Sequence, residues 1–347
     1  MMIDKQREAQ NVTLHCKELI DSQKEKVCKS IKSAIFGHAV GDALGLPVEF
    51  MSREKLVKCP VTDFLPWDLA GGPKGIWSDD TSMTLSTLKS LTEQGRFVPD
   101  DLMEQFRNWI QYGSLSPLGR AIGIGRTTFR AVMDYSNGKT AGGISSRDKG
   151  NGSLMRIAPV ILYQHFVLGN RVAWEKKIQD IHAASALTHA TETAMTACGI
   201  YAFLMDELLA KADPLSVQVG LQRAKDFYKG STEAETFAFL FLKDFPQVNR
   251  SHIHSSGYVV DTLEAAVWCL TTTNDYSACV LKAVNLGGDT DTIAAVAGAL
   301  AGVLYGVEAI PEKWISTLVL RAEIEILCES AAERWFRILE RMDDHAE

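Results

Sequence analysis

Apolar residues recur every three or four positions along most of this chain, the spacing that gathers them on one face of an α-helix. Runs of alternating β-branched residues, which would indicate strands, are scarce. The pattern therefore predicts an all-α protein, folded as a compact orthogonal helical bundle. The groups that carry it are Leu102/Phe106/Trp109, Ile178/Ile181, Ala194/Cys198/Tyr201, Phe237/Leu240/Phe241, Leu263/Val267/Leu270 and Ile315/Leu318/Val319.

One apolar segment, Ile293 to Gly306, is dominated by small residues between Ala294 and Gly302. Small side chains let a helix approach its neighbours closely, although each interior glycine costs ~1 kcal/mol of helix propensity. The segment is too short and too rich in glycine to span a bilayer. We expect this helix at the centre of the bundle.

Composition narrows the class of protein. The chain has 347 residues, of which 46% are hydrophobic and 23% charged, so it can bury a large core. Its formal net charge of −7 argues against a nucleic-acid surface, which is usually basic. Scattered cysteines without Cys-x-x-Cys spacing fit a reducing compartment, and no secretory signal is visible. We expect a cytoplasmic monomer that binds neither nucleic acid nor membrane.

Two pairs of aspartates precede predicted helices. Asp79 and Asp80 follow Ser78, whereas Asp289 and Asp291 open the small-residue segment. A single carboxylate is enough to cap a helix, contributing about 0.5–2 kcal/mol, so capping leaves a surplus. The surplus carboxylates would repel each other if they met without a cation. Carboxylate and hydroxyl oxygens suit Mg²⁺ and Mn²⁺, so the pattern predicts one shared metal site.

Several segments, read in order, resemble the signatures of the ADP-ribosylglycohydrolase family. The likeness spans roughly residues 32 to 306, most of the length of a domain. It implies an all-α bundle of that family's type and a hydrolase acting on ADP-ribose linkages. The segments are Gly37–Gly45, Gly75–Thr81, Gly150–Arg156, Ser256–Ala266 and Gly287–Thr292.

The resemblance implies a binuclear centre of two Mg²⁺ ions, with Mn²⁺ as the alternative metal. The implied ligands are Ser78, Asp79, Asp80, Asp289, Asp291 and Thr292. Ser78 stands where most members have threonine, but the hydroxyl is retained. Glu49 falls at the position of a mobile acidic residue that could shift a proton, with a solvated loop glutamate as the alternative. The implied catalytic residues are Asp80, Asp289, Asp291 and Glu49.

Substrate-binding residues follow from the same resemblance. The turn formed by Gly150, Asn151, Gly152 and Ser153 could present backbone N–H groups to a diphosphate, although such a turn is also an ordinary loop. His189 matches a family histidine that lies against a ribose. Tyr258 could stack on adenine or pack in the core. Another segment, Gly123–Thr128, has Gly123 where the family usually has Asp, and we assign it no catalytic role.

The expected reaction is hydrolysis of the bond between the anomeric carbon of ADP-ribose and a modified protein side chain. The arginine N-glycoside is the first candidate, so the enzyme would reverse ADP-ribosylation of a protein substrate. The expected domains are an N-terminal extension, residues 1–30, with alternating charge, and a catalytic domain, residues 31–347.

Three alternatives stay open. The extension could bind and occlude a cognate ADP-ribosyltransferase, as an immunity protein does, with or without hydrolysis, or it could be a solvated terminal helix. The chain could be a non-catalytic relative. It could also be a metallophosphatase, although the His ligands often found there are missing.

Overall fold

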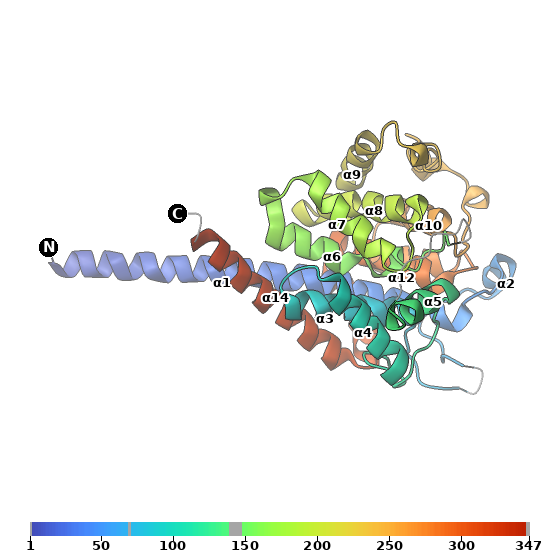
Figure 1. The fold of residues 1–347 in the computed structure, drawn as a ribbon, viewed down its shortest axis with the longest axis horizontal. Coiled ribbons are helices and arrows are strands. Elements are labelled where there is room, and N and C mark those ends of the chain that lie inside the picture. Colours follow the sequence, from blue (N-terminus) through green and yellow to red (C-terminus); the bar gives the residue numbers. More distant parts are fainter. Residues whose placement is uncertain (1, 69–70, 139–147, 345–347) are drawn as a thin grey trace.

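The computed structural model describes residues 2–68, 71–138 and 148–344, and α-helices dominate them (Figure 1). The β contact described within these ranges is an isolated bridge between Gly150 and Tyr258. The all-α prediction is therefore confirmed. The helices are α1 (Met2–Gly45), α2 (Arg53–Lys58), α3 (Asp79–Gln94), α4 (Pro99–Tyr112), α5 (Arg126–Ser136), α6 (Ala158–Tyr163), α7 (Trp174–Ala186), α8 (Glu192–Ala210), α9 (Pro214–Phe227), α10 (Val259–Thr271), α11 (Tyr276–Val284), α12 (Thr290–Tyr305), α13 (Glu312–Thr317) and α14 (Arg321–Asp344).

The small-residue helix α12 lies at the centre of the bundle, as predicted. Every residue from Thr290 to Leu304 is buried. The helix packs against α1, α10 and α11, with α8 also in contact. Because α12 is apolar on all its faces, burial on every side is its stable arrangement.

The packing of α1 against α12 depends on glycine. A Cβ atom added at Gly298 would overlap the carbonyl oxygen of Gly37, and one added at Gly41 would overlap that of Ala294. Gly302 makes the same kind of close approach to the backbone of α1. The two backbones therefore touch directly, and this contact brings the C-terminal end of α1 beside the first turn of α12.

Two of the predicted helical segments differ in the structure. The region from Phe237 to Phe241 forms successive turns, in which the N–H of Leu242 donates to the Phe239 carbonyl. Phe237 is nevertheless fully buried, so the apolar spacing reflects burial rather than a helix. Helix α13 ends at Thr317, because the Val319 N–H donates to the Gly75 carbonyl instead of continuing the helix.

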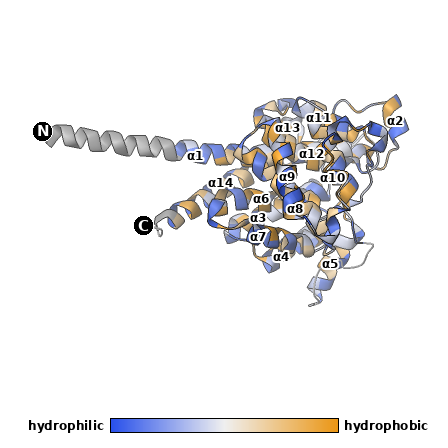
Figure 2. Ribbon diagram, turned by 90° about the horizontal axis from the view of Figure 1, so that it is seen from above, coloured by the Kyte–Doolittle hydropathy of each residue, from blue (hydrophilic) through white to orange (hydrophobic). Residues whose placement is uncertain are grey.

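Helix α1 runs without a break from Met2 to Gly45, so the division expected near residue 30 falls inside a continuous helix. Among the side chains described in α1, Val27 is the first buried one, and Ile31 follows it. Helix α14 lies beside the packed part of α1 in both views (Figures 1 and 2). The division of the chain into an extension and a catalytic domain stays a prediction.

One helix, α8, is long and apolar enough by composition to cross a membrane. However, 78% of its apolar window is buried inside the fold. It packs between α7, α9 and α10, which is the environment of a core helix in a globular protein.

The contact between α1 and α12 predicts a large effect of one methyl group. Gly298→Ala is expected to lower the free energy of unfolding by about 1–3 kcal/mol, the usual cost of overpacking. The ~1 kcal/mol that alanine gains in helix propensity offsets only part of the strain. Urea unfolding followed by circular dichroism measures the change. Gly125→Ala is the matched control, because a Cβ there meets no atom within 4 Å; equal stability of the two variants would contradict the backbone contact.

Candidate active site

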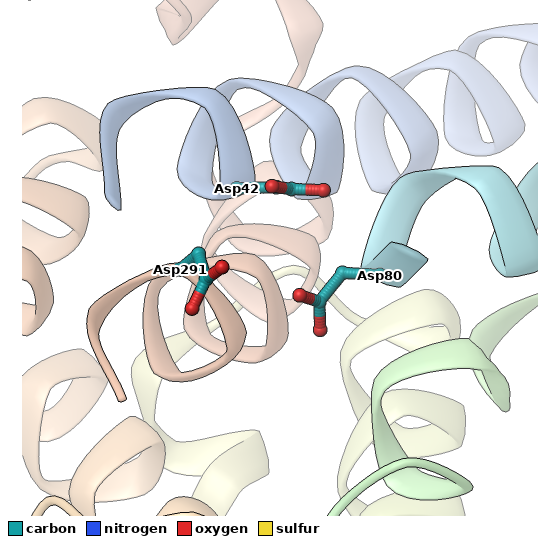
Figure 3. Close-up of side chains that lie close together, drawn as sticks. All are labelled: Asp42, Asp80 and Asp291. Carbon is teal, nitrogen blue, oxygen red and sulfur yellow. The ribbon is translucent and has the colours of Figure 1, made fainter. Parts of the chain in front are cut away.

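Acidic side chains from three helices meet at one end of the bundle. Carboxylate oxygens of Asp42, Asp80 and Asp291 lie within 4.8 Å of one another, and Figure 3 shows them around a common space. Oxygens of Glu49, Asp289 and Asp291 form a second group of the same size. Asp291 belongs to both groups, so the two possible cation positions are adjacent. Three of the four aspartates predicted to meet, Asp80, Asp289 and Asp291, thus belong to these groups, and Asp79 lines the same cleft.

Helix capping does not account for these carboxylates. The Ser78 hydroxyl caps α3 by accepting the Asp80 N–H at 3.3 Å. Asp289 is the N-cap residue of α12, but no side-chain capping hydrogen bond is present there. Asp291 accepts a single backbone N–H, that of Thr292, at 2.9 Å. Capping of the helix starts therefore does not explain why several carboxylates are present at each of them.

Asp80 is the clearest case of an incompletely satisfied acid. Its Oδ2 accepts from the Ser78 hydroxyl at 2.8 Å and from the Thr292 hydroxyl at 3.3 Å. Its Oδ1 is buried and has no hydrogen-bond partner among the described residues. A buried oxygen without a partner is costly, and a cation would satisfy it. The donor set, which consists of carboxylates and hydroxyls, fits a hard divalent ion.

The acids also perturb one another. Burial first, and then the charge of Asp42, raises the pKa of Asp79 and Asp80 well above the usual range. Burial and the charge of Asp80 raise the pKa of Asp291 in the same way. Like charges that are buried together favour protonation unless an opposite charge joins them.

Asp42 connects the end of α1 to the start of α3. Its carboxylate accepts the Ser78 N–H at 2.9 Å, the Thr81 N–H at 3.0 Å and the Thr81 hydroxyl at 2.6 Å. Burial raises its pKa to about 6, although these hydrogen bonds oppose the shift. Asp42 thereby fixes the first turn of α3, which carries Asp79 and Asp80.

Glu49 lines the site from a loop that is bonded to the segment just before α12. The Phe50 N–H donates to the Gly288 carbonyl at 2.7 Å, and the Gly288 N–H returns a bond to Met51 at 2.9 Å. Glu49 is half-buried, and burial together with the charge of Asp289 raises its pKa to about 7. Phe50 adopts a φ of 60°, which is uncommon for a bulky residue, and its side chain is 75% exposed.

A cleft of about 290 Å³ opens over the acidic groups. Most of the predicted site residues line it, whereas Ser78, Ser153 and Tyr258 do not belong to its lining. Ser78 lies buried behind Asp80, and the Ser153 hydroxyl accepts a hydrogen bond from Ser185 at 2.8 Å. The predicted residues that line the cleft are Glu49, Asp79, Asp80, Gly150, Asn151, Gly152, His189, Asp289, Asp291 and Thr292.

The glycine-rich turn is tied to the acidic groups through Asn151. Its Nδ2 donates to the Asp289 carboxylate at 2.8 Å and to the Thr262 hydroxyl at 2.9 Å. Its backbone N–H donates to the Gly257 carbonyl at 3.1 Å, next to the bridge that joins Gly150 and Tyr258. The Asn151 side chain thus orients an acid of the cluster, a contact that the spacing of residues in the sequence does not reveal.

The start of α5 adds cleft residues to which the sequence assigned no role. Arg126, Thr127 and Thr128 line the cleft, and no side chain caps this helix at Gly125. Phe50 is a further addition. The Gly123–Thr128 segment was visible as a loop, but only the folded chain places Gly123 directly against Asp79. An exposed aromatic residue such as Phe50 gives no periodic signal at all.

Comparisons with known proteins agree with this architecture. The ADP-ribosylglycohydrolase family model matches residues 23–342. ADP-ribosylarginine hydrolase Tri1 of Serratia proteamaculans is 32% identical, over 86% of this chain and 77% of that protein. ADP-ribosyl-(dinitrogen reductase) glycohydrolase of Rhodospirillum rubrum is 30% identical, over 84% of this chain and 91% of that protein.

A solved structure described as an ADP-ribosylglycohydrolase-related protein complex superposes with a TM-score of 0.71 at 30% identity. The match covers 91% of this chain and 99% of that one, so the likeness extends over the whole fold. The chain therefore belongs to the ADP-ribosylglycohydrolase family and is a hydrolase.

Proposed function

We propose that this hydrolase removes ADP-ribose from modified arginine side chains of proteins. The observation that carries the proposal is the pair of carboxylate groups that share Asp291 beneath a cleft. The names of the relatives support the arginine linkage. A cytoplasmic location and a monomeric state stay predictions from composition.

We propose Mg²⁺, with Mn²⁺ as the alternative, as the metal of this centre, bound as two adjacent ions. When bound, such ions orient substrate oxygens and lower the pKa of a water molecule. The orphaned oxygen of Asp80 and the surplus carboxylates support this assignment. The proposed ligands are Ser78, Asp79, Asp80, Asp289, Asp291 and Thr292.

The protein's own residues have distinct parts in the reaction. Cleavage of the glycosidic bond develops positive charge at the anomeric carbon, which the acidic floor of the cleft stabilises. Glu49, with a pKa near neutrality, can hold or release a proton at the cleft mouth. The Asn151 N–H is already bonded to the Gly257 carbonyl, so the N–H groups of Gly150 and Gly152 and the uncapped start of α5 are the donors proposed for a diphosphate. His189 is the proposed residue for the sugar, and Tyr258, which lies outside the cleft lining but bridges to Gly150, stays the proposed residue for the base.

The proposed reaction predicts a specific linkage and a metal requirement. Arginine-linked ADP-ribose on a protein should be released in the presence of magnesium, and an excess of EDTA should stop the release. Serine-linked, O-acetyl and nucleic-acid-linked ADP-ribose should be released more slowly. Chromatographic measurement of free ADP-ribose distinguishes these outcomes. Equal turnover with EDTA present would contradict the metal requirement.

Variants of the acidic residues provide the control for this experiment. Asp80→Asn and Asp291→Asn keep the size of the side chain and should each reduce turnover roughly 100-fold or more. Asp213→Asn is the control variant. It makes the same chemical change at an aspartate that also lies at a helix start, but Asp213 caps α9 and does not line the cleft. It should leave turnover unchanged. Full activity of either cleft variant in a folded protein would exclude the proposed site.

Metal binding should depend on pH. The pKa values of Asp79, Asp80 and Asp291 are raised in the folded protein, so the folded state binds more protons than the unfolded state. Without a cation, the free energy of unfolding therefore falls as pH rises and these acids ionise. A cation must displace those protons, so its affinity increases with pH. Magnesium should therefore raise the Tm of EDTA-treated protein more at pH 8 than at pH 6. An equal gain at the two pH values would contradict proton displacement.

We propose a second role for the N-terminal part of α1, namely binding and occluding a cognate ADP-ribosyltransferase. The supporting observation is that α1 extends N-terminal to residue 23, where the family match begins, and that its described side chains from Asp21 to Lys26 are not buried. Deleting residues 1–20 should weaken binding to the purified transferase at least tenfold, measured by calorimetry. Turnover of a small ADP-ribosyl-arginine substrate should not change. Unaltered affinity of the truncated protein would rule out this role.

A further inference from the structure

A buried arginine without an acidic partner lies behind the cleft. Arg156 is fully buried, and its guanidinium lies 4.7 Å from the centre of the Phe106 ring. Among the described residues it forms no ion pair, and its Nε and Nη1 have no hydrogen-bond partner. Burial lowers its pKa only to about 10, so it stays charged at neutral pH. An unpaired buried charge is costly, which indicates that the charge has a function.

The Arg156 guanidinium fixes the direction of one hydrogen bond. Its Nη2 donates to the Thr188 hydroxyl at 2.8 Å and to the Ala184 carbonyl at 3.0 Å. Because arginine has donors and no acceptor, the Thr188 oxygen must accept this bond. The other described partner of that hydroxyl is Nδ1 of His189, at 2.9 Å. A hydroxyl oxygen can accept two hydrogen bonds, but Nδ1 is the one acceptor described for the Thr188 proton. A bond from Nδ1–H to Thr188 would leave that buried proton without a partner among the described residues, so the proton is assigned to the bond to Nδ1.

The direction of this bond determines where His189 carries its proton. An imidazole nitrogen that accepts a hydrogen bond is unprotonated, so the proton of the neutral ring lies on Nε2. Burial and the positive charge of Arg156 hold the pKa of His189 at about 3, so the ring stays neutral. The charge of the arginine thus helps to keep the ring neutral, and the direction of the hydrogen bond selects the tautomer.

The Nε2 edge of His189 lies against the glycine-rich turn that lines the cleft. A Cβ added at Gly152 would lie 2.8 Å from Cε1 and 3.2 Å from Nε2 of the ring, so the ring rests directly against the glycine-rich turn. His189 and Gly152 both line the cleft. The Ser185 hydroxyl contacts the His189 carbonyl at 3.1 Å, and the His189 N–H donates to the Ser185 carbonyl at 2.8 Å. The residue is therefore held at both its backbone and its ring.

We propose that Arg156 and Thr188 are positioning residues that lock His189 as a neutral Nε2–H donor, aimed at an acceptor oxygen of ADP-ribose in the cleft. The identity of the ligand rests on the proposed function, whereas the lock rests on the hydrogen bonds alone. Arginine suits this position because its planar guanidinium holds its N–H donors in a fixed geometry toward the Thr188 hydroxyl and the Ala184 carbonyl, whereas a lysine would present only a point charge. A fixed donor keeps the hydroxyl or phosphate oxygens of the ligand in one orientation without reorganisation on binding.

Nitrogen-15 NMR of the histidine rings tests the lock directly. The protein is labelled with ¹⁵N-histidine, and the signals of His189, one of eight histidines, are identified by their loss in His189→Gln. In the ligand-free wild type at pH 7, Nδ1 should be unprotonated and hydrogen-bonded, and Nε2 should carry the proton. Thr188→Val keeps the shape but removes the hydroxyl, so the Nδ1 resonance should shift and a second tautomer should become visible. Thr188→Ser keeps the hydroxyl and should retain the wild-type signals.

Calorimetry with ADP-ribose connects the tautomer to binding. Thr188→Val should weaken ADP-ribose affinity about threefold to tenfold, the effect of one impaired hydrogen bond, whereas Thr188→Ser should not. A proton on Nδ1 of the wild type, or unchanged Nδ1 signals and affinity in Thr188→Val, would overturn the proposal. A locked Nε2–H tautomer in a protein that does not bind ADP-ribose would support the lock and refute the proposed ligand. The two ideas therefore fail separately.

Discussion

Direct backbone contact between α1 and α12 is the constraint on which the cleft depends. Glycines on both helices allow the approach, and any side chain there would force the helices apart. The contact places the end of α1, which carries Asp42, beside the first turn of α12, which carries Asp291. Asp42 then binds the start of α3 through the backbone of Ser78. One close-packed crossing therefore sets the relative positions of three acid-bearing helix ends.

The energetic consequence of this geometry is a concentration of buried negative charge. Raised pKa values of Asp79, Asp80 and Asp291 show that the fold alone does not satisfy these carboxylates. Such an arrangement opposes folding unless a cation or bound protons compensate it. The buried Oδ1 of Asp80, which has no hydrogen-bond partner in the described part of the chain, is the local sign of the same conflict. The acidic site therefore lowers the stability of the metal-free protein, and burial of the large apolar core around α12 offsets this cost.

The glycine-rich turn and His189 contribute a different feature to the cleft, namely neutral donors held in fixed positions. Asn151 is bound to Asp289 and Thr262, so its amide has a set orientation. His189 is held through Thr188 and the backbone of Ser185. The glycines of the turn bring the backbone close to the imidazole ring. A sugar diphosphate has many acceptor oxygens, so a rigid set of donors suits it better than mobile charged side chains would.

The local sequence determined the helical class of this protein, its central helix and the positions of its acid-bearing helix starts. Helical periodicity specified the helical class, small residues marked the central helix, and the paired aspartates marked two helix starts with more carboxylates than capping requires. These features are local because they depend on spacing within a few residues. The error at Phe237–Phe241 has the same origin, since buried turns can imitate helical spacing.

Tertiary structure alone decided which residues meet. Three sets of contacts join segments that are distant in the sequence. They are the two acidic groups that share Asp291, the hydrogen bonds between Phe50 and Gly288, and the connection from Arg156 through Thr188 to His189. Such contacts depend on how closely helices pack and on which atoms face inward. Side-chain type and spacing carry no record of the direction of a hydrogen bond or of the distance between two helix ends, so only the packed chain fixes them.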